Sequence, residues 1–483
     1  MTNIKFNFNN SYVTLPEILY TYTDPIKVSN PKIVIVNKDL MLELGLNDSD
    51  MGDNELANLL SGNVMPEGSD PVAMAYAGHQ FGGFTLLGDG RAHLIGEHIA
   101  PNSKRYDVHL KGSGRTPYAR GGDGRAALGP MLREYIMSEA MYALGIATTR
   151  SLAVTATGET VPRETPLAGA VLTRIASSHI RIGTFEYAAH KQNPDLVKCL
   201  LDYTIQRHYL DVKNANNPAI ALLKGVIEKQ TDLITHWMRV GFIHGVMNTD
   251  NMTLSGETID YGPCAFMDVY DAKTVFSSID RNARYAYGNQ PLMAQWNIAR
   301  LAESLLPLID PNIDKAIEIA EDIVNGVQDI YAQKWLNMMR AKLGLCGKNP
   351  QDKQLIDDLL SWMTINHIDY TNCFRSLSSD QKPQEKVYHC RKFNDWYQKW
   401  QNRLALEKSK QASISLMRQN NPAIIPRNHN VENALEQANA GNMQPFNDLL
   451  AALKTPYCEH ENIKCYQSPP QPSERVFQTF CGT

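Results

Sequence analysis

Residues 242–262 read FIHGVMNTDNMTLSGETIDYG and hold carboxylate and amide side chains at short intervals. Asp250 and Asn251 close a loop-like stretch, and Asp260 opens an Asp-Tyr-Gly run a little further on. Between them, two short runs of alternating polarity flank a Ser-Gly-Glu turn, which predicts two strands joined as a hairpin. Amide and carboxylate oxygens that converge beside such a hairpin are the hard ligands that Mg²⁺ and Mn²⁺ prefer. The stretch therefore predicts a metal site built from Asn251 and Asp260.

Upstream of this stretch lie a strand signal and a helix signal. Tyr106–Lys111 alternates in polarity, which predicts a strand with Lys111 on the face opposite the apolar one. Gly129–Gly145 has a proline in its first turn and a glycine at its end, which predicts a helix with Glu134 near its start. Protein kinases hold a strand lysine against the phosphates of ATP with a helix glutamate, and their catalytic loop precedes a metal-binding Asp-Phe-Gly motif. An ordinary polar hairpin in a helical lobe is the alternative interpretation.

A short motif occurs twice, because Gly88–Ala92 and Gly122–Ala126 both read Gly-Asp-Gly-Arg-Ala. Glycine permits the positive φ angles that turn backbone N–H groups into an anion-binding concavity, and the arginine adds donors for phosphate oxygens. Arg174 and Arg181 follow at the end of a strand-like run and offer two further cations to a triphosphate. Gly-rich turns with solvated surface arginines are the alternative.

The two halves of the chain have different patterns. Residues 70–180 are rich in Gly and Arg with short alternating apolar runs, whereas the chain beyond residue 290 has helical periodicity. The clearest helical segments are 314–345, 353–365 and 385–408. We therefore expect an α+β protein with two lobes. Residues 1–180 would form a mixed α/β lobe with an N-terminal extension, and residues 181–483 an α-rich lobe with the catalytic loop, the metal-binding motif and a C-terminal tail.

Composition excludes several other classes of protein. The chain has 483 residues, 47 basic and 51 acidic side chains, a net charge of −4 and no basic tail, which argues against nucleic-acid binding. No apolar run is long enough to span a bilayer, and Met1–Tyr20 lacks the features of a secretory signal, so we expect a cytoplasmic protein without a membrane partner. P-loop and Rossmann glycine motifs are missing, and His79, His109, His179 and His244 lack metal-ligand spacing, so we expect these histidines to be structural.

Taken together, these motifs resemble the selenoprotein O (SelO) family of kinase-like protein adenylyltransferases, of the bacterial YdiU type, over nearly the whole chain. The runs that carry the resemblance are residues 78–82, 110–114, 122–126, 244–251, 259–263 and 284–287. The resemblance implies a protein-kinase-like two-lobe fold with a helical C-terminal extension. It also implies that ATP binds in a flipped orientation and that AMP is transferred to Ser, Thr or Tyr hydroxyls of proteins. UMP transfer from UTP, favoured by Mn²⁺, is attributed to bacterial members.

The same resemblance assigns roles to individual residues. Asp250 would be the proton acceptor, Asn251 and Asp260 would bind Mg²⁺ or Mn²⁺, and Glu134 would form an ion pair with Lys111. The nucleotide would be held by Gly88, Gly90, Arg91, Lys111, Asp123, Gly124, Arg174 and Arg181. ATP and protein substrates are then the partners, and we expect a monomer. We also expect Asp260 to be an exposed cleft carboxylate whose loss spares the fold.

Two other functions are compatible with these residues. A kinase that transfers the γ-phosphate would need the same Lys, Glu, Asp and Asn set. A non-catalytic nucleotide-binding scaffold is suggested by the His-Gly start of the loop, although a scaffold would have no need for every charged position.

The eight cysteines are scattered and form no CxxC pair. Members of the family often carry a C-terminal Cys that bridges to a Cys after the Asp-Tyr-Gly motif. Cys481 fits the tail position, but Phe276 stands at the usual partner position. We therefore hypothesise a redox-sensitive bridge between Cys481 and Cys264.

Overall fold

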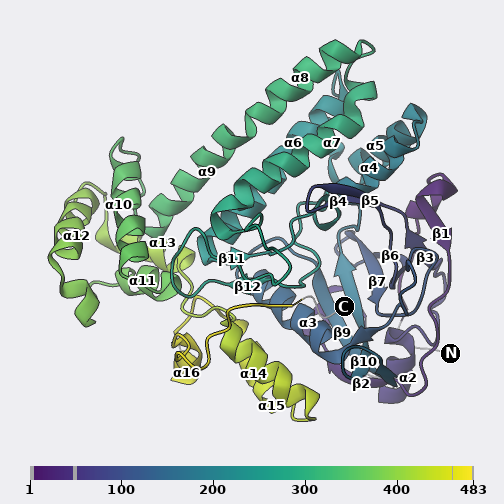
Figure 1. Ribbon diagram of the computed structural model, residues 1–483, viewed down its shortest axis with the longest axis horizontal. Coiled ribbons are helices and arrows are strands. Elements are labelled where there is room, and N and C mark those ends of the chain that lie inside the picture. Colours follow the sequence, from purple (N-terminus) through teal and green to yellow (C-terminus); the bar gives the residue numbers. More distant parts are fainter. Residues whose placement is uncertain (1–4, 47–51, 460, 481–483) are drawn as a thin grey trace.

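The computed structural model describes residues 5–46, 52–459 and 461–480, and the protein is a mixed α/β protein (Figure 1). Most strands form one antiparallel sheet in the order β1-β3-β6-β7-β10-β9-β2, and β8 pairs with β10. Its strands are β1 (Tyr20–Tyr22), β2 (Lys32–Val36), β3 (Val72–Met74), β6 (Ala92–Ile99), β7 (Arg105–Lys111), β8 (Ala126–Ala127), β9 (Arg150–Val161) and β10 (Leu167–Ala176). The central strand β7 ends at Lys111, which pairs with Ala92 and Leu172.

The two faces of this sheet pack against different helices. Val108 and Leu110 belong to a buried cluster with side chains of α1 (Lys38–Glu43) and α2 (Asp53–Leu60). Because side chains alternate along a strand, Lys111 leaves the opposite face, where helix α3 lies. The strand predicted at residues 106–111 and the orientation of Lys111 are therefore confirmed.

Helix α3 (Leu128–Ala143) is the helix predicted at residues 129–145. Pro130 stands in its first turn, where a missing N–H leaves no hydrogen bond unmade. Gly145 has a φ of 72°, in the left-handed region, and a helix ends readily in this conformation only at glycine. Glu134 is 2% exposed and Arg133 6% exposed, so this helix carries charged groups into the interior.

Helices dominate the chain from residue 182 onward, as expected. They are α4 (Ile182–His190), α5 (Pro194–His208), α6 (Pro218–Val240), α7 (Gln290–Ile309), α8 (Ile313–Asn325), α9 (Val327–Lys342), α10 (Asp352–Ile365), α11 (Tyr370–Leu377), α12 (Arg391–Leu404), α13 (Lys410–Asn420), α14 (Asn428–Asn439), α15 (Gln444–Leu453) and α16 (Lys464–Gln467). The segment 314–345 is two helices, because Gly326 separates α8 from α9 and glycine is a poor helix former. Both lie along the upper edge of the molecule in Figure 1. The division into lobes at residue 180 stays a prediction.

The hairpin predicted at residues 252–260 is wrong. Thr253 forms a bridge with Arg181, and Thr258 forms one with Thr148, so the two strand-like runs pair with other segments. The turn between them is closed by the Thr253 hydroxyl, which donates to the Glu257 carbonyl at 2.7 Å and accepts from the Glu257 N–H at 3.0 Å. The flanking strands β11 (Phe242–Ile243) and β12 (Ala265–Phe266) pair with each other instead.

A hairpin lies elsewhere, outside the main sheet. Strands β4 (Ala77–Gln80) and β5 (Gly83–Leu86) form a two-stranded sheet that packs against α4 and against the 3-10 turn Thr249–Asn251. Phe81 and Gly82 at its tip both have positive φ angles. The hairpin therefore brings residues near position 80 to the loop that carries Asp250.

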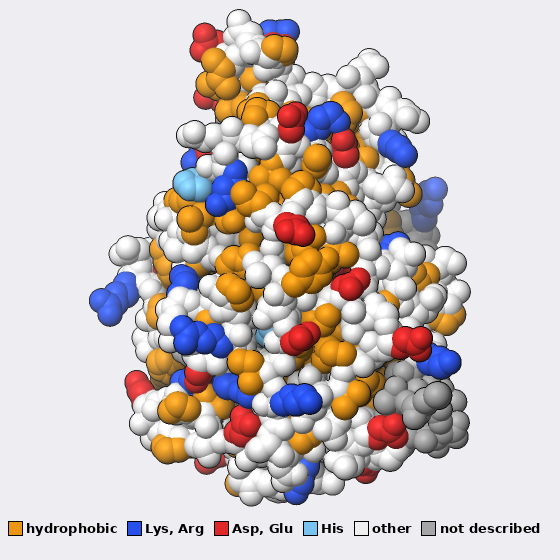
Figure 2. All heavy atoms as spheres, turned by 90° about the vertical axis from the view of Figure 1, so that its right-hand side faces the viewer, with side chains coloured by type: hydrophobic (Ala, Val, Ile, Leu, Met, Phe, Trp, Pro, Cys, Tyr) orange, Lys and Arg blue, Asp and Glu red, His pale blue; other side chains and the backbone are white. Residues whose placement is uncertain are grey.

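Charge is dispersed on the surface that Figure 2 presents. Lys and Arg side chains are interspersed there with Asp, Glu and hydrophobic side chains. Neither the basic nor the acidic side chains form a continuous patch on this face. In the described ranges, none of the helices is both long enough and apolar enough to cross a membrane.

Candidate active site

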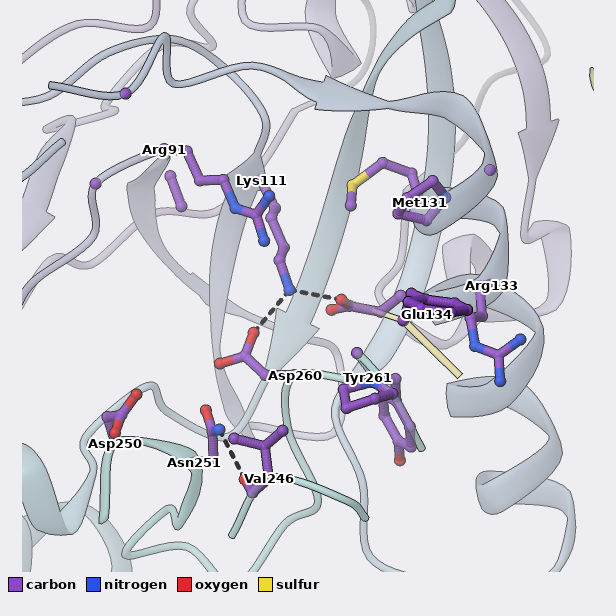
Figure 3. Close-up of a pocket in the computed structure, with 18 of the residues that line it drawn as sticks. Arg91, Lys111, Met131, Arg133, Glu134, Val246, Asp250, Asn251, Asp260 and Tyr261 are labelled. Atoms are coloured by element: carbon purple, nitrogen blue, oxygen red, sulfur yellow. Dashed lines mark hydrogen bonds and ion pairs between the residues drawn. The ribbon is translucent and has the colours of Figure 1, made fainter. Parts of the chain in front are cut away.

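One large cavity, of about 1040 Å³, lies where the sheet, α3 and the 242–262 stretch meet. Its lining includes every residue for which a site role was predicted. These residues are Gly88, Gly90, Arg91, Lys111, Asp123, Gly124, Glu134, Arg174, Arg181, Asp250, Asn251 and Asp260. Figure 3 shows the side chains of Glu134 and Asp260 pointing toward Lys111, with Asp250 and Asn251 on the other side of Asp260.

Lys111 forms two ion pairs at the end of β7. Its Nζ atom lies 2.6 Å from Glu134 Oε2 and 2.7 Å from Asp260 Oδ1 (Figure 3). The side chains of Lys111 and Glu134 are 10% and 3% exposed, so water screens this pair weakly. The lysine therefore connects the sheet, α3 and the Asp-Tyr-Gly segment.

Asp260 is the meeting point of three cations. Its Oδ1 accepts hydrogen bonds from Lys111 Nζ and Arg174 Nη1, and its Oδ2 accepts one from Arg181 Nη1, each at 2.7 Å. Burial alone would raise the pKa of Asp260, but the charges of Lys111, Arg174 and Arg181 hold it well below its usual range. The expectation of an exposed cleft carboxylate is wrong, because the Asp260 side chain is only 20% exposed and neutralises buried cations.

Arg174 and Arg181 are buried rather than solvated. They are 1% and 3% exposed, and both donate to Asp260. Arg174 Nη1 also donates to Glu134 Oε1 at 3.2 Å, and Arg181 Nη1 donates to the Asp250 carbonyl at 2.7 Å. Both guanidinium groups are thus held at the cavity wall by fixed acceptors.

Asp250 lies in the 3-10 turn and is 7% exposed. Its Oδ2 accepts a hydrogen bond from Gln80 Nε2 at 3.4 Å, whereas its buried Oδ1 has no hydrogen-bond partner among the described residues. Burial raises the pKa of Asp250 to about 6, and the nearby Arg181 charge opposes that rise. A carboxylate with one unused oxygen can accept a proton or contact a cation.

The residues beside Asp250 suit a divalent cation. Asn251 Nδ2 donates to the Val246 carbonyl at 2.8 Å, which leaves the Asn251 side-chain oxygen toward Asp260 (Figure 3). Together with the Asp260 carboxylate, this amide oxygen gives the hard oxygen ligands that Mg²⁺ and Mn²⁺ prefer. No group of three or more His, Cys, Asp or Glu able to hold a metal occurs in the described part of the chain. An ion here would therefore need ligands from water or phosphate.

The two Gly-Asp-Gly-Arg turns have different surroundings. Gly88 has a φ of 135°, and a Cβ atom there would lie 2.5 Å from the Tyr118 ring, so only glycine fits. Asp89 in this first copy is 3% exposed, and Arg91 lies next to Lys111 (Figure 3). In the second copy, Asp123 is exposed and pairs with Arg163 at 2.7 Å. The copies are therefore not equivalent sites.

Sequence patterns did not reveal how the β4–β5 hairpin reaches the catalytic loop. The His79 N–H donates to Thr249 Oγ1 at 2.7 Å, and the Phe81 N–H donates to Asn248 Oδ1 at 3.1 Å. Thr249 Oγ1 donates in turn to Glu186 Oε2 at 2.5 Å, and the same glutamate contacts the His79 ring. The one available signal was that residues 78–82 are a run in which the family resemblance is dense.

The C-terminal part of the chain also contributes to the cavity wall. Arg133 Nη1 on α3 donates to Glu432 on α14 at 2.5 Å. In the tail, the Thr479 hydroxyl donates to the Pro263 carbonyl at 2.6 Å, and its N–H donates to the Phe276 carbonyl at 2.7 Å. Cys264 is fully buried, and Cys481 lies outside the described residues, so the proposed bridge between them stays a hypothesis.

Comparisons with known proteins agree along the whole chain. The family model for protein adenylyltransferase SelO matches residues 2–454. Three similar relatives carry the name protein nucleotidyltransferase YdiU. The relative from Nitrosococcus oceani is 56% identical over 485 residues, covering 100% of this chain and 98% of its own. Those from Anoxybacillus flavithermus and Bacillus cytotoxicus are 55% and 54% identical, covering 100% and 99% of this chain and 100% and 98% of their own.

Proposed function

The chain belongs to the protein adenylyltransferase SelO family, and from this premise we propose that it transfers AMP from ATP to Ser, Thr or Tyr hydroxyls of proteins. The observation that carries the proposal is the cavity in which Lys111, Glu134, Asp250, Asn251 and Asp260 meet, within a chain that matches the family over its length. The chain is a nucleotidyltransferase, and the proposal includes a protein-kinase-like fold with two lobes. The Lys111–Glu134 pair and the position of Asp260 support the kinase-like part of this proposal.

In the proposed reaction, a protein hydroxyl oxygen attacks the α-phosphorus of ATP and pyrophosphate leaves. Lys111, Arg174 and Arg181 bind the phosphates, because they are fixed cations at the cavity wall. The glycines and arginine of the first Gly-Asp-Gly-Arg turn, with Asp123 and Gly124 of the second, hold the rest of the nucleotide in the flipped orientation. These fixed charges need little reorganisation during the reaction, which is the main source of acceleration in this chemistry.

Asn251 and Asp260 would hold Mg²⁺ or Mn²⁺, which supplies positive charge to the phosphates when bound. Asp250 takes the proton of the attacking hydroxyl. Gln80 Nε2 donates a hydrogen bond to Oδ2 of this carboxylate. Arg181 holds the backbone of this loop through the Asp250 carbonyl, so base and phosphate site keep a constant separation.

Three further parts of the proposal rest on the sequence and the family alone. UTP would serve as an alternative substrate with Mn²⁺, giving UMP transfer. The protein would act as a monomer, and it would act in the cytoplasm. Nucleic acid and membranes are not proposed as partners.

Labelled ATP tests the proposed reaction. Purified protein is incubated with cell lysate and Mg²⁺ or Mn²⁺, with ATP labelled at the α-phosphate in one sample and at the γ-phosphate in another. We expect protein label from the α-position only. Label from the γ-position only would make the protein a kinase, and label from neither would favour a nucleotide-binding scaffold. A parallel sample with Asp260→Asn protein controls for contaminating activities.

A further inference from the structure

Arg174 is oriented by a histidine that has no role in the proposed reaction. Arg174 Nη2 lies 3.2 Å from the Nδ1 atom of His109, while Arg174 Nη1 faces Glu134 and Asp260. His109 is 0% exposed, and its strand β7 also carries Lys111 two positions later. The contact is therefore adjacent to the three cations Lys111, Arg174 and Arg181.

The hydrogen-bond partners of His109 determine its tautomer. A guanidinium group can only donate, so Nδ1 of His109 must be an unprotonated acceptor. The ring proton is then on Nε2, which lies 3.2 Å from Asp89 Oδ2 and donates to it. Burial lowers the pKa of His109, which agrees with a neutral ring.

Asp89 connects this histidine to the first Gly-Asp-Gly-Arg turn. The Oδ2 atom of Asp89 also accepts from the Met74 N–H at 3.2 Å, its carbonyl accepts from the Thr116 hydroxyl at 2.6 Å, and its Oδ1 lies 3.9 Å from Arg181 Nη2. Asp123, the matching residue of the second copy, has no such place in the interior. Asp89 thus holds the first Gly-Asp-Gly-Arg turn in place through hydrogen bonds in the protein interior.

A second histidine keeps the His109 ring in place. The rings of His109 and His179 stack with their centroids 4.1 Å apart and an angle of 20° between their planes. His179 is itself fixed, because its backbone N–H and its Nδ1 lie 2.8 and 2.9 Å from Asp107 Oδ2. The His109 ring therefore has little freedom to turn away from Arg174.

We propose that His109, fixed by Asp89 and by stacking on His179, is a positioning residue that aims Arg174 at the phosphates of the nucleotide. The inference rests on the proposed function only in naming the nucleotide as ATP. It explains why a buried aspartate and a buried histidine lie behind the anion-binding turn. Without this acceptor, Arg174 would be held through its Nη1 atom alone, and the orientation of the guanidinium plane would be less restricted.

Two substitutions test the roles of the two ring nitrogens of His109 separately. The amide oxygen of His109→Asn lies near the position of Nδ1 and keeps an acceptor for Arg174. The amide of His109→Gln reaches the position of Nε2, keeps the donor to Asp89 and loses the acceptor for Arg174. We expect His109→Gln to weaken binding of α,β-methylene-ATP with Mg²⁺ about tenfold by calorimetry, because a hydrogen bond to a charged group is lost. We expect His109→Asn to stay within about threefold of the parent.

His98→Gln is the matched control. His98 is also buried in the same sheet, and its ring contacts the Asn7 N–H and the Leu44 carbonyl, remote from Arg174. We expect this variant to lower the melting temperature without changing nucleotide affinity. Equal affinity losses in His109→Gln and His109→Asn, or an unchanged affinity in folded His109→Gln, would overturn the proposal.

A measurement on the parent protein covers the case in which the variants do not fold. ¹⁵N NMR of histidine-labelled protein should show His109 neutral, protonated at Nε2 and unprotonated at Nδ1. A proton on Nδ1 would make acceptance from Arg174 impossible and would overturn the proposal. Both measurements use binding or ring protonation, so they remain decisive even if the labelled-ATP experiment shows no AMP transfer.

Discussion

Lys111 Nζ lies 2.7 Å from Asp260 Oδ1, although the two residues are 149 positions apart in the chain. Arg174 and Arg181 reach the same carboxylate, so a single negative group is surrounded by three cations before any nucleotide binds. Glu134 balances part of this charge. These cations are fixed in place before a polyanion binds, which is the condition for strong electrostatic catalysis.

Asp260→Asn should remove both a metal ligand and the shared counterion of these cations. We expect AMP transfer to fall at least about 100-fold. The melting temperature should fall as well, because buried cations lose their partner. ATP without metal should raise the melting temperature of the variant more than that of the parent, since its phosphates replace the lost charge. An unchanged melting temperature and rate would show that Asp260 has neither role.

Local sequence patterns predicted correctly those features that depend on residues close together in the chain. Strand alternation placed Lys111, and Pro130 and Gly145 bounded the helix with Glu134. The hairpin at residues 252–260 was predicted wrongly because Thr253 and Thr258 satisfy their backbone groups with distant segments.

Tertiary contacts account for what the sequence could not reveal. Arginine side chains are usually solvated, so the sequence alone does not predict that Arg174 is buried. Its burial depends on hydrogen-bond acceptors from β7, α3 and the Asp-Tyr-Gly segment. The contact between His79 and Thr249 spans 170 positions, and no periodicity encodes it. The position of the hairpin over Asp250 therefore required the structure.

Asp250→Asn should slow transfer without weakening nucleotide binding. The substitution removes the proton acceptor but keeps the size of the side chain and a contact for Gln80. We expect kcat to fall about 100-fold, at the lower end of the range for general-base catalysis, with the KM for ATP within about threefold. A melting temperature equal to that of the parent is expected, because the buried Oδ1 has no hydrogen-bond partner among the described residues. Full activity would remove Asp250 from the mechanism.

The rate of transfer should depend on pH through the same residue. Burial raises the pKa of Asp250 to about 6, and only the ionised carboxylate can take the proton of the hydroxyl. As the pH falls below about 6, kcat should therefore decrease, approaching tenfold for each further pH unit. Initial rates between pH 5 and pH 8 would measure this, and Asp250→Asn protein should lose that limb of the profile. A parent profile that is flat down to pH 5 would contradict the assignment.

Acid should destabilise the fold partly through His236. Burial lowers the pKa of His236 to about 4, whereas the unfolded residue titrates near the usual value of about 6.5. Between these values only the unfolded chain binds the proton, so stability is lost as the pH falls from about 6.5 toward 4. His236→Gln removes this titration. The free energy of unfolding of the variant minus that of the parent should therefore increase by about 1 kcal/mol from pH 7.5 to pH 5, because only the parent loses stability through this histidine. Urea unfolding at both pH values would measure the difference, and a constant difference would contradict the prediction.

Two glycines of the β4–β5 hairpin provide a matched test of its contact with the catalytic loop. A Cβ atom on Gly78 would lie 2.2 Å from Asp250 Oδ1, whereas one on Gly83 would have no neighbour closer than 3.5 Å. The loop cannot simply move away, because Asn248 and Thr249 are bonded to the same hairpin. We therefore expect Gly78→Ala to lower kcat at least about tenfold by displacing the base, with nucleotide affinity retained. Gly83→Ala should behave as the parent. Equal kcat values for the two variants would mean that the hairpin does not position Asp250.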